Sequence, residues 1–176
     1  MIYIALGANL PSKFGTPRQT LRRAVSEIAV RGVRVISRSS IYLTAPVPIS
    51  NQPWYHNAVI AVETSLSAHD LLQTLHQIEA DFGRVRSVQN APRVIDIDVL
   101  DYNGTVSSLK ELELPHPRMV DRAFVLFPLS EIAPAWCHPV TGISIDDYIA
   151  ALSTDQSIKR DNSPEIMGII NVTPDS

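Results

Sequence analysis

The chain has 176 residues, of which 45% are hydrophobic and 19% are charged. This length and composition are typical of one globular domain, or of one domain with a tail, that can bury a proper core. The formal net charge of −3 excludes a general attraction to nucleic acid or to anionic membranes. The lone Cys137 excludes an intrachain disulfide, and the first apolar run is too short for a signal peptide, so we expect a cytoplasmic protein.

The first half of the chain predicts strands on either side of a helix. The apolar run at 2–6 is typical of a short buried strand. Thr16 and Pro17 are typical of a helix start, and apolar residues then recur at helical spacing until Gly32. Residues 33–42 and 57–64 predict two further strands, and the proline-rich segment between them predicts a loop.

A second helix is predicted to start at Ser67, to present apolar residues from 71 to 82, and to end at Gly83. An acidic strand follows it. The order strand, helix, strand, strand, helix, strand is the split βαβ pattern of ferredoxin-like folds. We therefore predict an α+β fold with a mainly antiparallel sheet, helices packed on it, and extra C-terminal helices within 118–132 and after Ser144.

Asp96 and Asp98 are the most informative side chains. Their period-two spacing in a strand places both carboxylates on one face, with backbones about 6.6 Å apart. Two adjacent carboxylates repel each other unless a cation neutralises them, and oxygen ligands suit magnesium. Arg84, Arg86 and Arg93 precede them and have the shape that binds phosphate. The alternative is the solvated face of an edge strand beside a solvated basic loop.

Other candidates also have structural alternatives. Tyr55 and Asn57 offer an aromatic face and an amide that suit a flat heterocycle, but a packed loop explains them as well. Glu79, near the end of the second helix, fits a helical salt bridge or a ligand role. His116 between two prolines fits a ligand cluster or a hydrogen-bonded structural role. Because the chain contains no Walker loop, any nucleotide would be held by arginines and metal.

Taken together, these motifs closely resemble the 6-hydroxymethyl-7,8-dihydropterin pyrophosphokinase family, which acts in the folate pathway. The resemblance spans residues 1 to about 135 in family order. The matching segments are ALGANL at 5–10, YLTAP at 42–46, YHNA at 55–58, IE at 78–79, GRVR at 83–86, PRVIDID at 92–98, LPHPRM at 114–119 and RAFVL at 122–126.

This resemblance implies transfer of pyrophosphate from ATP to the hydroxymethyl group of 6-hydroxymethyl-7,8-dihydropterin, with release of AMP. It implies that Asp96 and Asp98 hold two Mg²⁺ ions and act as catalytic residues together with Arg84 and Arg93. The implied ATP-binding residues are Glu79, Arg84, Arg86, Arg93, Val99, His116 and Arg122. The implied pterin-binding residues are Thr44, Ala45, Val47, Tyr55, Asn57 and Phe124, with the pterin stacked between Tyr55 and Phe124.

Two other functions stay open from the residues alone. In a ferredoxin-like, non-catalytic ligand-binding or regulatory module, the acidic strand would merely be solvated. An ATP-dependent nucleotidyltransferase would release pyrophosphate instead of AMP. One segment also departs from the family: residues 87–91 are uncharged, whereas some members have a longer loop with a basic residue and a tryptophan. We still expect this segment to act as a lid.

The last residues carry a second resemblance. EIMGIINVTPDS, at 165–176, is similar to the opening strand and loop of dihydropteroate synthase, a TIM barrel that typically needs about 250 residues. We therefore expect a pyrophosphokinase domain at 1–152, a polar linker at 153–164 and the truncated start of a synthase domain at 165–176. The expected partners are the pterin, ATP and a covalently linked synthase domain, without nucleic acid or membrane.

Overall fold

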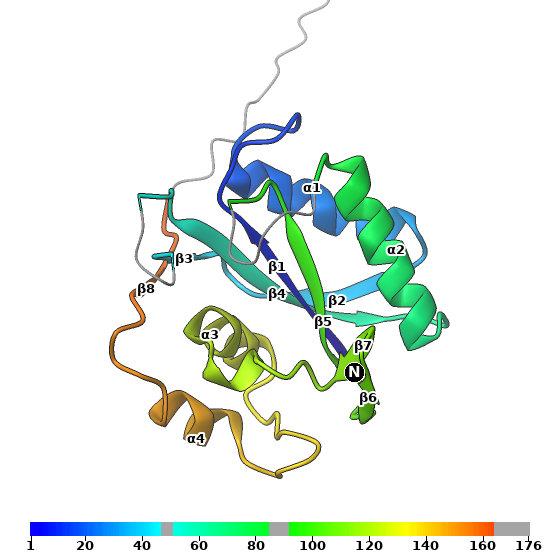
Figure 1. Cartoon of the computed structure of the whole chain (residues 1–176), viewed down its shortest axis with the longest axis vertical. Coiled ribbons are helices and arrows are strands. Elements are labelled where there is room, and N and C mark those ends of the chain that lie inside the picture. Colours follow the sequence, from blue (N-terminus) through cyan, green and yellow to red (C-terminus); the bar gives the residue numbers. More distant parts are fainter. Residues whose placement is uncertain (47–50, 85–91, 164–176) are drawn as a thin grey trace, which may run out of the picture.

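The computed structural model describes residues 1–46, 51–84 and 92–163. It has the predicted α+β architecture, with an antiparallel six-stranded sheet and helices on both of its faces (Figure 1). Val47, Arg86, the segment 87–91 and the tail at 165–176 lie outside the described residues. No helix in the described ranges is both long enough and apolar enough to span a bilayer.

The strands of the main sheet are β1 (Ile2–Ala8), β2 (Arg34–Arg38), β3 (Tyr42–Thr44), β4 (Tyr55–Glu63), β5 (Asp96–Tyr102) and β8 (Ile158–Arg160). The helices are α1 (Pro17–Val30), α2 (Ala68–Asp81), α3 (Ala123–Ile132) and α4 (Ile145–Ala150), with a 3-10 turn, η1, at Met119–Asp121. The sheet order is β5–β1–β4–β3–β8, and β2 also pairs with β4. A separate hairpin joins β6 (Ser107–Leu109) and β7 (Leu112–Leu114).

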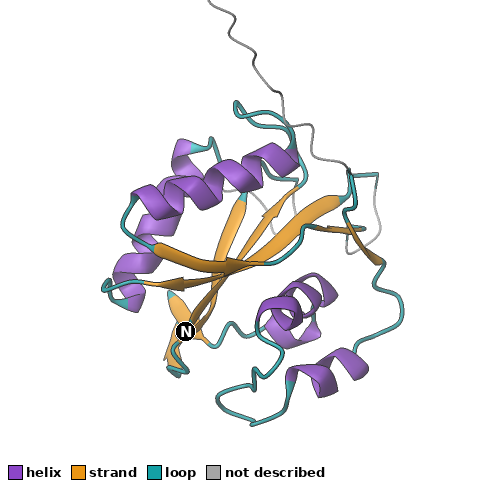
Figure 2. Cartoon of the chain, turned by 180° about the vertical axis from the view of Figure 1, so that it is seen from behind, coloured by secondary structure: helices purple, strands orange, loops and turns teal. Residues whose placement is uncertain are grey.

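The sheet separates two hydrophobic cores. Helices α1 and α2 cover one face, and α3 and α4 lie on the other, as seen from both sides in Figures 1 and 2. The core beneath α1 and α2 includes Ile4, Leu21, Leu75 and Ile97. The core beneath α3 includes Val59, Leu100, Leu126 and Trp136. Central strands are therefore buried on both faces, which leaves the strand ends as the places where polar side chains reach solvent.

The predicted helix starts are confirmed by their caps. Thr16 forms a capping box with Gln19, and the hydroxyl groups of Ser67 and Ser144 accept hydrogen bonds from backbone N–H groups three residues later. After α2, Gly83 has a φ of 87°, a left-handed conformation that costs glycine little. This turn redirects the chain at the point where Arg84 begins the basic segment.

Two predicted features differ in the structure. The strand expected at 33–42 is divided into β2 and β3, because the hydroxyl group of Ser39 accepts from the N–H of Val59 and interrupts the ladder. The expected linker at 153–164 contains β8, which pairs antiparallel with β3 at the edge of the sheet. A polar sequence suits this exposed edge, and the partner strand lies more than a hundred residues earlier, so local pattern does not reveal it.

A register shift in β5 keeps its third carboxylate on the face of the first two. Asp96 pairs with Gly7, Asp98 with Ala5, and Asp101 with Tyr3, because the pairing skips one residue of β5. Asp101 is 4% exposed and accepts hydrogen bonds from the indole N–H of Trp136 at 2.9 Å and from the N–H of Gly104 at 2.7 Å. Asp101 is thus a structural carboxylate that anchors the α3 side of the fold.

Replacing Asp101 with Ala is expected to lower the free energy of unfolding by about 2–4 kcal/mol, because the buried indole N–H of Trp136 and the partly buried N–H of Gly104 lose their acceptor. Asp101→Asn keeps one acceptor oxygen and is expected to lose about half as much. Urea unfolding of the two variants and the wild type measures both values. A loss below about 0.5 kcal/mol for Asp101→Ala, the range of ordinary surface changes, would contradict this role.

Candidate active site

Asp96 and Asp98 begin β5 and point to the α3 face of the sheet, as their alternation predicts. Ile97, between them, is 1% exposed and packs in the opposite core, whereas both aspartates are only half-buried. No described side chain donates a hydrogen bond to Asp98, while Asp96 lies between two arginines. The pair is therefore held at a sheet end that solvent reaches.

Arg84 connects Asp96 with the end of α2. Its guanidinium forms an ion pair with Glu79 and lies 2.6 Å from Oδ1 of Asp96. Glu79 is 2% exposed, and its Oε1 also accepts a hydrogen bond of 2.7 Å from the N–H of Ile97. Glu79 thus holds both the guanidinium of Arg84 and the backbone of β5 at Ile97.

Arg93 approaches Asp96 from the opposite direction. Its Nη1 lies 2.6 Å from Oδ2 of Asp96. Its backbone is fixed by Asn9: the N–H of Arg93 donates to Oδ1 of Asn9, and the carbonyl of Arg93 accepts from the N–H groups of Asn9 and Leu10. Asp96 therefore sits between two guanidinium groups, and a phosphate bound here would meet both of them.

Burial and the repulsion of neighbouring carboxylates raise the pKa values of Glu79 and Asp98. Burial raises the pKa of Glu79 to about 7, although the charge of Arg84 and the Ile97 N–H both lower it. Burial, followed by the charge of Asp96, raises the pKa of Asp98. Carboxylates held at such a cost are stabilised when a cation binds between them.

The donor set fits magnesium. In the described part of the chain, no group of three or more His, Cys, Asp or Glu side chains surrounds a metal site. The site instead offers two carboxylates on one face, at the half-buried start of a strand. Magnesium is usually bound through one or two carboxylates, with water and substrate phosphates as its other ligands. A closed zinc site would need four protein ligands, and these two carboxylates supply only two of them.

His116 and Arg122 complete the α3 side of the cluster. Burial, with the charges of Arg122 and Arg118, lowers the pKa of His116 to about 4, so its imidazole is neutral near pH 7. Its Nδ1 accepts from the N–H of Arg118, which leaves the proton on Nε2 as a donor. Arg122 forms no ion pair with the described residues, and its guanidinium lies 5.3 Å from the ring centre of Phe124. Its positive charge acts on Asp98 and Asp96 and would also attract an anionic ligand.

A second group of predicted residues lies between β3, β4 and the start of α3. Asn57 is 5% exposed and donates to the hydroxyl oxygen of Thr44 at 2.9 Å. Its position depends on Gly7, since a Cβ there would lie 2.9 Å from Oδ1 of Asn57. A small pocket beside this pair is lined by Thr44, Ala45, Ala123, Phe124, Gln156 and Ser157.

Tyr55 links the two groups. Its hydroxyl donates to Oε1 of Gln52 at 3.2 Å, the same oxygen that accepts from the side-chain amide of Asn9 at 3.3 Å. Asn9 is 1% exposed and donates in turn to Gln52 and to the carbonyl of Pro53. The arginine cluster and the aromatic loop are therefore held together through one buried amide.

Most of the predicted site residues that the structure describes thus lie in these two connected groups, and the side chain of Val99 is an exception. The side chain of Val99 is 4% exposed and packs in the core under α1 and α2, so only its backbone is available to a ligand. Gly7, Asn9 and Gln156 were not predicted as site residues. Gly7 and Asn9 lie in the matched segment at 5–10, which was the available signal for them, whereas nothing in the polar sequence around Gln156 indicates a role.

An α+β fold in which arginines flank a pair of carboxylates is typical of proteins that bind a metal ion together with phosphate groups. Residues 3–134 match the family model for 7,8-dihydro-6-hydroxymethylpterin-pyrophosphokinase (HPPK). The chain is 46% identical over 133 residues to the 2-amino-4-hydroxy-6-hydroxymethyldihydropteridine pyrophosphokinase of Methylorubrum extorquens, covering 75% of this chain and 82% of that protein. The chain therefore belongs to the HPPK family, as its motifs imply.

Longer proteins are also similar to this chain. It is 35% identical over 192 residues to the folic acid synthesis protein fol1 of Pneumocystis carinii, which covers 99% of this chain but 25% of that protein. The chain thus spans about a quarter of that relative's length. Its fold is similar to that of Plasmodium falciparum HPPK-DHPS with STZ-DHP, with a TM-score of 0.66 at 13% identity, over 85% of this chain and 42% of that one.

Proposed function

We propose that this chain transfers pyrophosphate from ATP to the hydroxymethyl group of 6-hydroxymethyl-7,8-dihydropterin and releases AMP, in folate biosynthesis. Family membership supports this proposal, and one observation carries it further. Asp96 and Asp98 lie beside Arg84 and Arg93, and Asn9 links the backbone of Arg93 to the loop expected to bind the pterin. The residues proposed to bind phosphate and those proposed to bind the pterin would therefore form one site.

Asp96 and Asp98 are the proposed ligands of two Mg²⁺ ions. Their half-buried carboxylates and the raised pKa of Asp98 support this assignment. When bound, magnesium neutralises phosphate charge in the transition state of phosphoryl transfer. Asp96 would then exchange part of its contact with the arginines for contact with the metal, which leaves the guanidinium groups available to the phosphates.

Several cationic and neutral donors would bind ATP. Arg84, Arg93 and Arg122 would contact its phosphates, and Glu79 would act by holding Arg84 in place. The neutral His116 would donate from Nε2, and Val99 would contribute only its backbone. Arg86 is assigned to the same side of the site by family resemblance alone, because it lies outside the described residues.

The pterin is proposed to stack between Tyr55 and Phe124. The Asn57 amide, fixed by Thr44, would recognise its polar edge, with Ala45 beside it in the same pocket. Val47 belongs to this proposal only through the family resemblance.

The residues accelerate the reaction chiefly by positioning the two substrates. The hydroxymethyl oxygen attacks the β-phosphorus and gives up its proton to water. The bond from that phosphorus to the oxygen shared with the α-phosphorus breaks, and AMP leaves with that oxygen. Arg84 and Arg93 stabilise the charge that develops on the phosphoryl oxygens. Tyr55, connected to Arg93 through Gln52 and Asn9, fixes the distance between the pterin and the phosphates.

We extend the proposal to the fold and the domain organisation. The order β5–β1–β4–β2, with α1 and α2 on one face, supports a ferredoxin-like core within a pyrophosphokinase domain at 1–152, which also includes α3 and α4. Residues 153–164 would connect this domain to a synthase domain that begins at 165–176. The names of longer relatives support a covalently linked synthase. The cytoplasmic location stays a prediction.

A product assay tests the proposed function. ATP, Mg²⁺ and the hydroxymethyl pterin are incubated with the chain, and the nucleotide product is identified by chromatography. The proposal predicts AMP that forms only when both the pterin and Mg²⁺ are present. Release of pyrophosphate would instead indicate a nucleotidyltransferase. Binding of the pterin without turnover would indicate a non-catalytic ligand-binding module.

Replacing Tyr55 with Ala is expected to weaken pterin binding about 10- to 100-fold, since stacking on an aromatic ring is worth about 1–3 kcal/mol per base. ATP binding is expected to change less than about threefold. Tyr55→Phe is the matched control, because it keeps the ring but loses the hydroxyl bond to Gln52. Calorimetric titration with each ligand measures both affinities, and equal losses for pterin and ATP would argue against stacking.

A further inference from the structure

The C-terminal segment 156–160 lies beyond the family-matched residues, 3–134, yet it contacts the proposed pterin pocket. Gln156 and Ser157 line the pocket together with Thr44, Ala45, Ala123 and Phe124. This part of the chain has no role in the proposed reaction. Its contacts are nevertheless directed at the elements that carry the pterin-binding side chains.

Gln156 caps the N-terminus of α3. Its Oε1 accepts from the N–H of Ala123 at 2.8 Å, and its Nε2 donates to the carbonyl of Asp121 at 2.9 Å. Arg122, the N-cap residue of α3, makes no side-chain capping bond of its own. An amide from a distant segment therefore satisfies a helix N–H that lacks a local partner. Phe124 is the next residue, so this cap sets the position of its ring.

The same segment holds the other wall of the pocket. The N–H of Ala45 donates to the carbonyl of Ser157 at 3.3 Å, and Thr44 pairs with Ile158 in the β3–β8 ladder. Figure 1 shows β8 beside β3 at the edge of the sheet. Residues 156–158 thus bridge β3, which carries Thr44, and α3, which carries Phe124.

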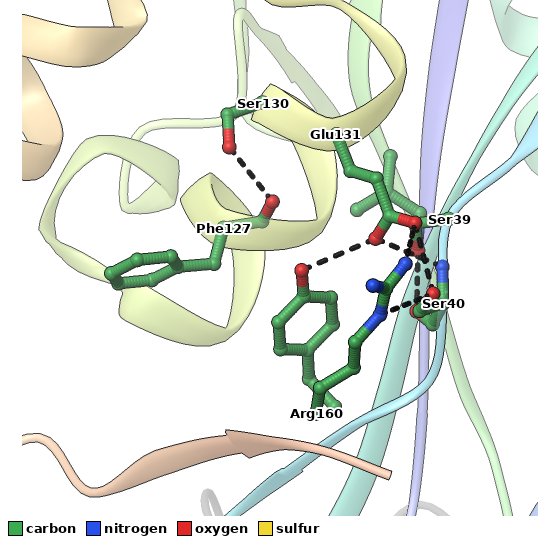
Figure 3. A network of polar contacts seen from close by, with 8 residues as sticks. Ser39, Ser40, Phe127, Ser130, Glu131 and Arg160 are labelled. Carbon is green, nitrogen blue, oxygen red and sulfur yellow. Dashed lines mark hydrogen bonds and ion pairs between the residues drawn. The ribbon is translucent and has the colours of Figure 1, made fainter. Parts of the chain in front are cut away.

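Arg160 locks this bridge in place. Its Nη2 lies 2.6 Å from Oε1 of Glu131 on α3, and its Nε donates to the hydroxyl of Ser40 at 2.7 Å. Glu131 also accepts from the hydroxyl groups of Ser40 and Tyr42. Figure 3 shows Glu131 and Arg160 directed at each other, next to Ser40. The register of β8, and with it the position of Gln156, is therefore fixed relative to both walls.

We propose that Gln156 is a positioning residue for the pterin pocket, and that segment 156–160 makes pterin affinity depend on the chain that follows the pyrophosphokinase domain. This inference rests on the proposed function. It assigns a substrate-binding role to a segment outside the family match, at the position where the chain continues toward the expected synthase. A displacement of β8 would shift Thr44 and the start of α3, which carries Phe124, and would not act directly on Asp96.

The experiment uses the full chain with Gln156→Ala, and with Thr154→Ala as a matched control on the same segment. Thr154 is exposed, and its side chain forms no hydrogen bond with the residues that the structure describes. AMP release is measured while the pterin and ATP are varied separately. For Gln156→Ala we expect the KM for pterin to rise about 5- to 20-fold, the range of a lost helix cap. We expect kcat and the KM for ATP to stay within about twofold, and Thr154→Ala to match the wild type.

Gln156→Glu provides a rescue, because its carboxylate still accepts from the N–H of Ala123 and suits a helix N-terminus. We expect its KM for pterin to lie closer to the wild-type value than that of Gln156→Ala. A pterin KM within twofold of wild type in Gln156→Ala, or an equal rise for pterin and ATP, would overturn the inference. If the wild type releases no AMP, the proposed function fails, and the inference fails with it.

Discussion

Asp98→Ala is expected to reduce pterin-dependent AMP formation by about a thousandfold or more, since stabilisation of charge by a bound metal is worth several kcal/mol in the transition state. The stability of the folded protein is not expected to fall. Burial and Asp96 both raise the pKa of Asp98, so its negative charge opposes folding near neutral pH when no metal is present. Its removal should therefore leave the free energy of unfolding unchanged or higher. Steady-state kinetics and urea unfolding measure the two effects.

A carboxylate on the same strand provides the control. Asp101→Asn is expected to lower stability and to keep the wild-type activity, because Asp101 bonds to Trp136 and Gly104 rather than to the cluster. The two variants thus have opposite profiles. Wild-type turnover by Asp98→Ala would show that Asp98 is not part of the active site. A loss of activity that only follows a loss of stability would show that its role is structural.

Arg84→Ala is expected to lower kcat/KM about 100- to 1,000-fold, because the phosphates lose a guanidinium that acts in a partly water-excluded site. It is also expected to cost about 3–5 kcal/mol of stability, the usual result of breaking a buried ion pair. The reason is Glu79, which is 2% exposed and loses its cationic partner. Kinetics at saturating Mg²⁺ and denaturant unfolding measure these losses.

A double variant distinguishes the effect of Arg84 on kcat/KM from its effect on stability. Glu79→Gln combined with Arg84→Ala removes both charges, so we expect most of the stability to return while kcat/KM stays low. Arg84→Lys should restore stability more than activity, because an ammonium group lacks the fork of a guanidinium. Recovery of activity together with stability in the double variant would show that Arg84 acts only by stabilising the fold.

Local signals in the sequence predict much of this fold. The caps at Thr16, Ser67 and Ser144 are confirmed because the groups that form them lie within three residues of each other. The period-two spacing of Asp96 and Asp98 places them on one face in any strand. These features depend on nearby residues alone, so the chain pattern is sufficient to find them.

The remaining features depend on partners far along the chain. Strand β8 forms only because β3 offers it an open edge, and the polar sequence of 153–164 predicts a linker instead. Asn9 reaches Pro53 and Arg93, and Gln156 reaches Ala123 and Asp121. No periodicity records such contacts, so the residues that join the two halves of the site were missed.

The candidate site shows the same division. The sequence predicts that Asp96, Arg84 and Arg93 belong together, and the structure brings them within hydrogen-bonding distance. It does not predict that Glu79 would be almost completely buried, nor that the pKa of His116 would fall to about 4. Burial is a property of the folded chain, since it depends on which elements cover a side chain.

The most direct test of the central claim is the crystallographic electron density of the chain with Mg²⁺, a non-hydrolysable ATP analogue and 6-hydroxymethylpterin. The account predicts two metal peaks about 3.5–4 Å apart, coordinated by Asp96 and Asp98 and by phosphate oxygens. It also predicts the pterin ring between Tyr55 and Phe124. Phosphates bound without metal at these two carboxylates, or a pterin bound elsewhere, would contradict it.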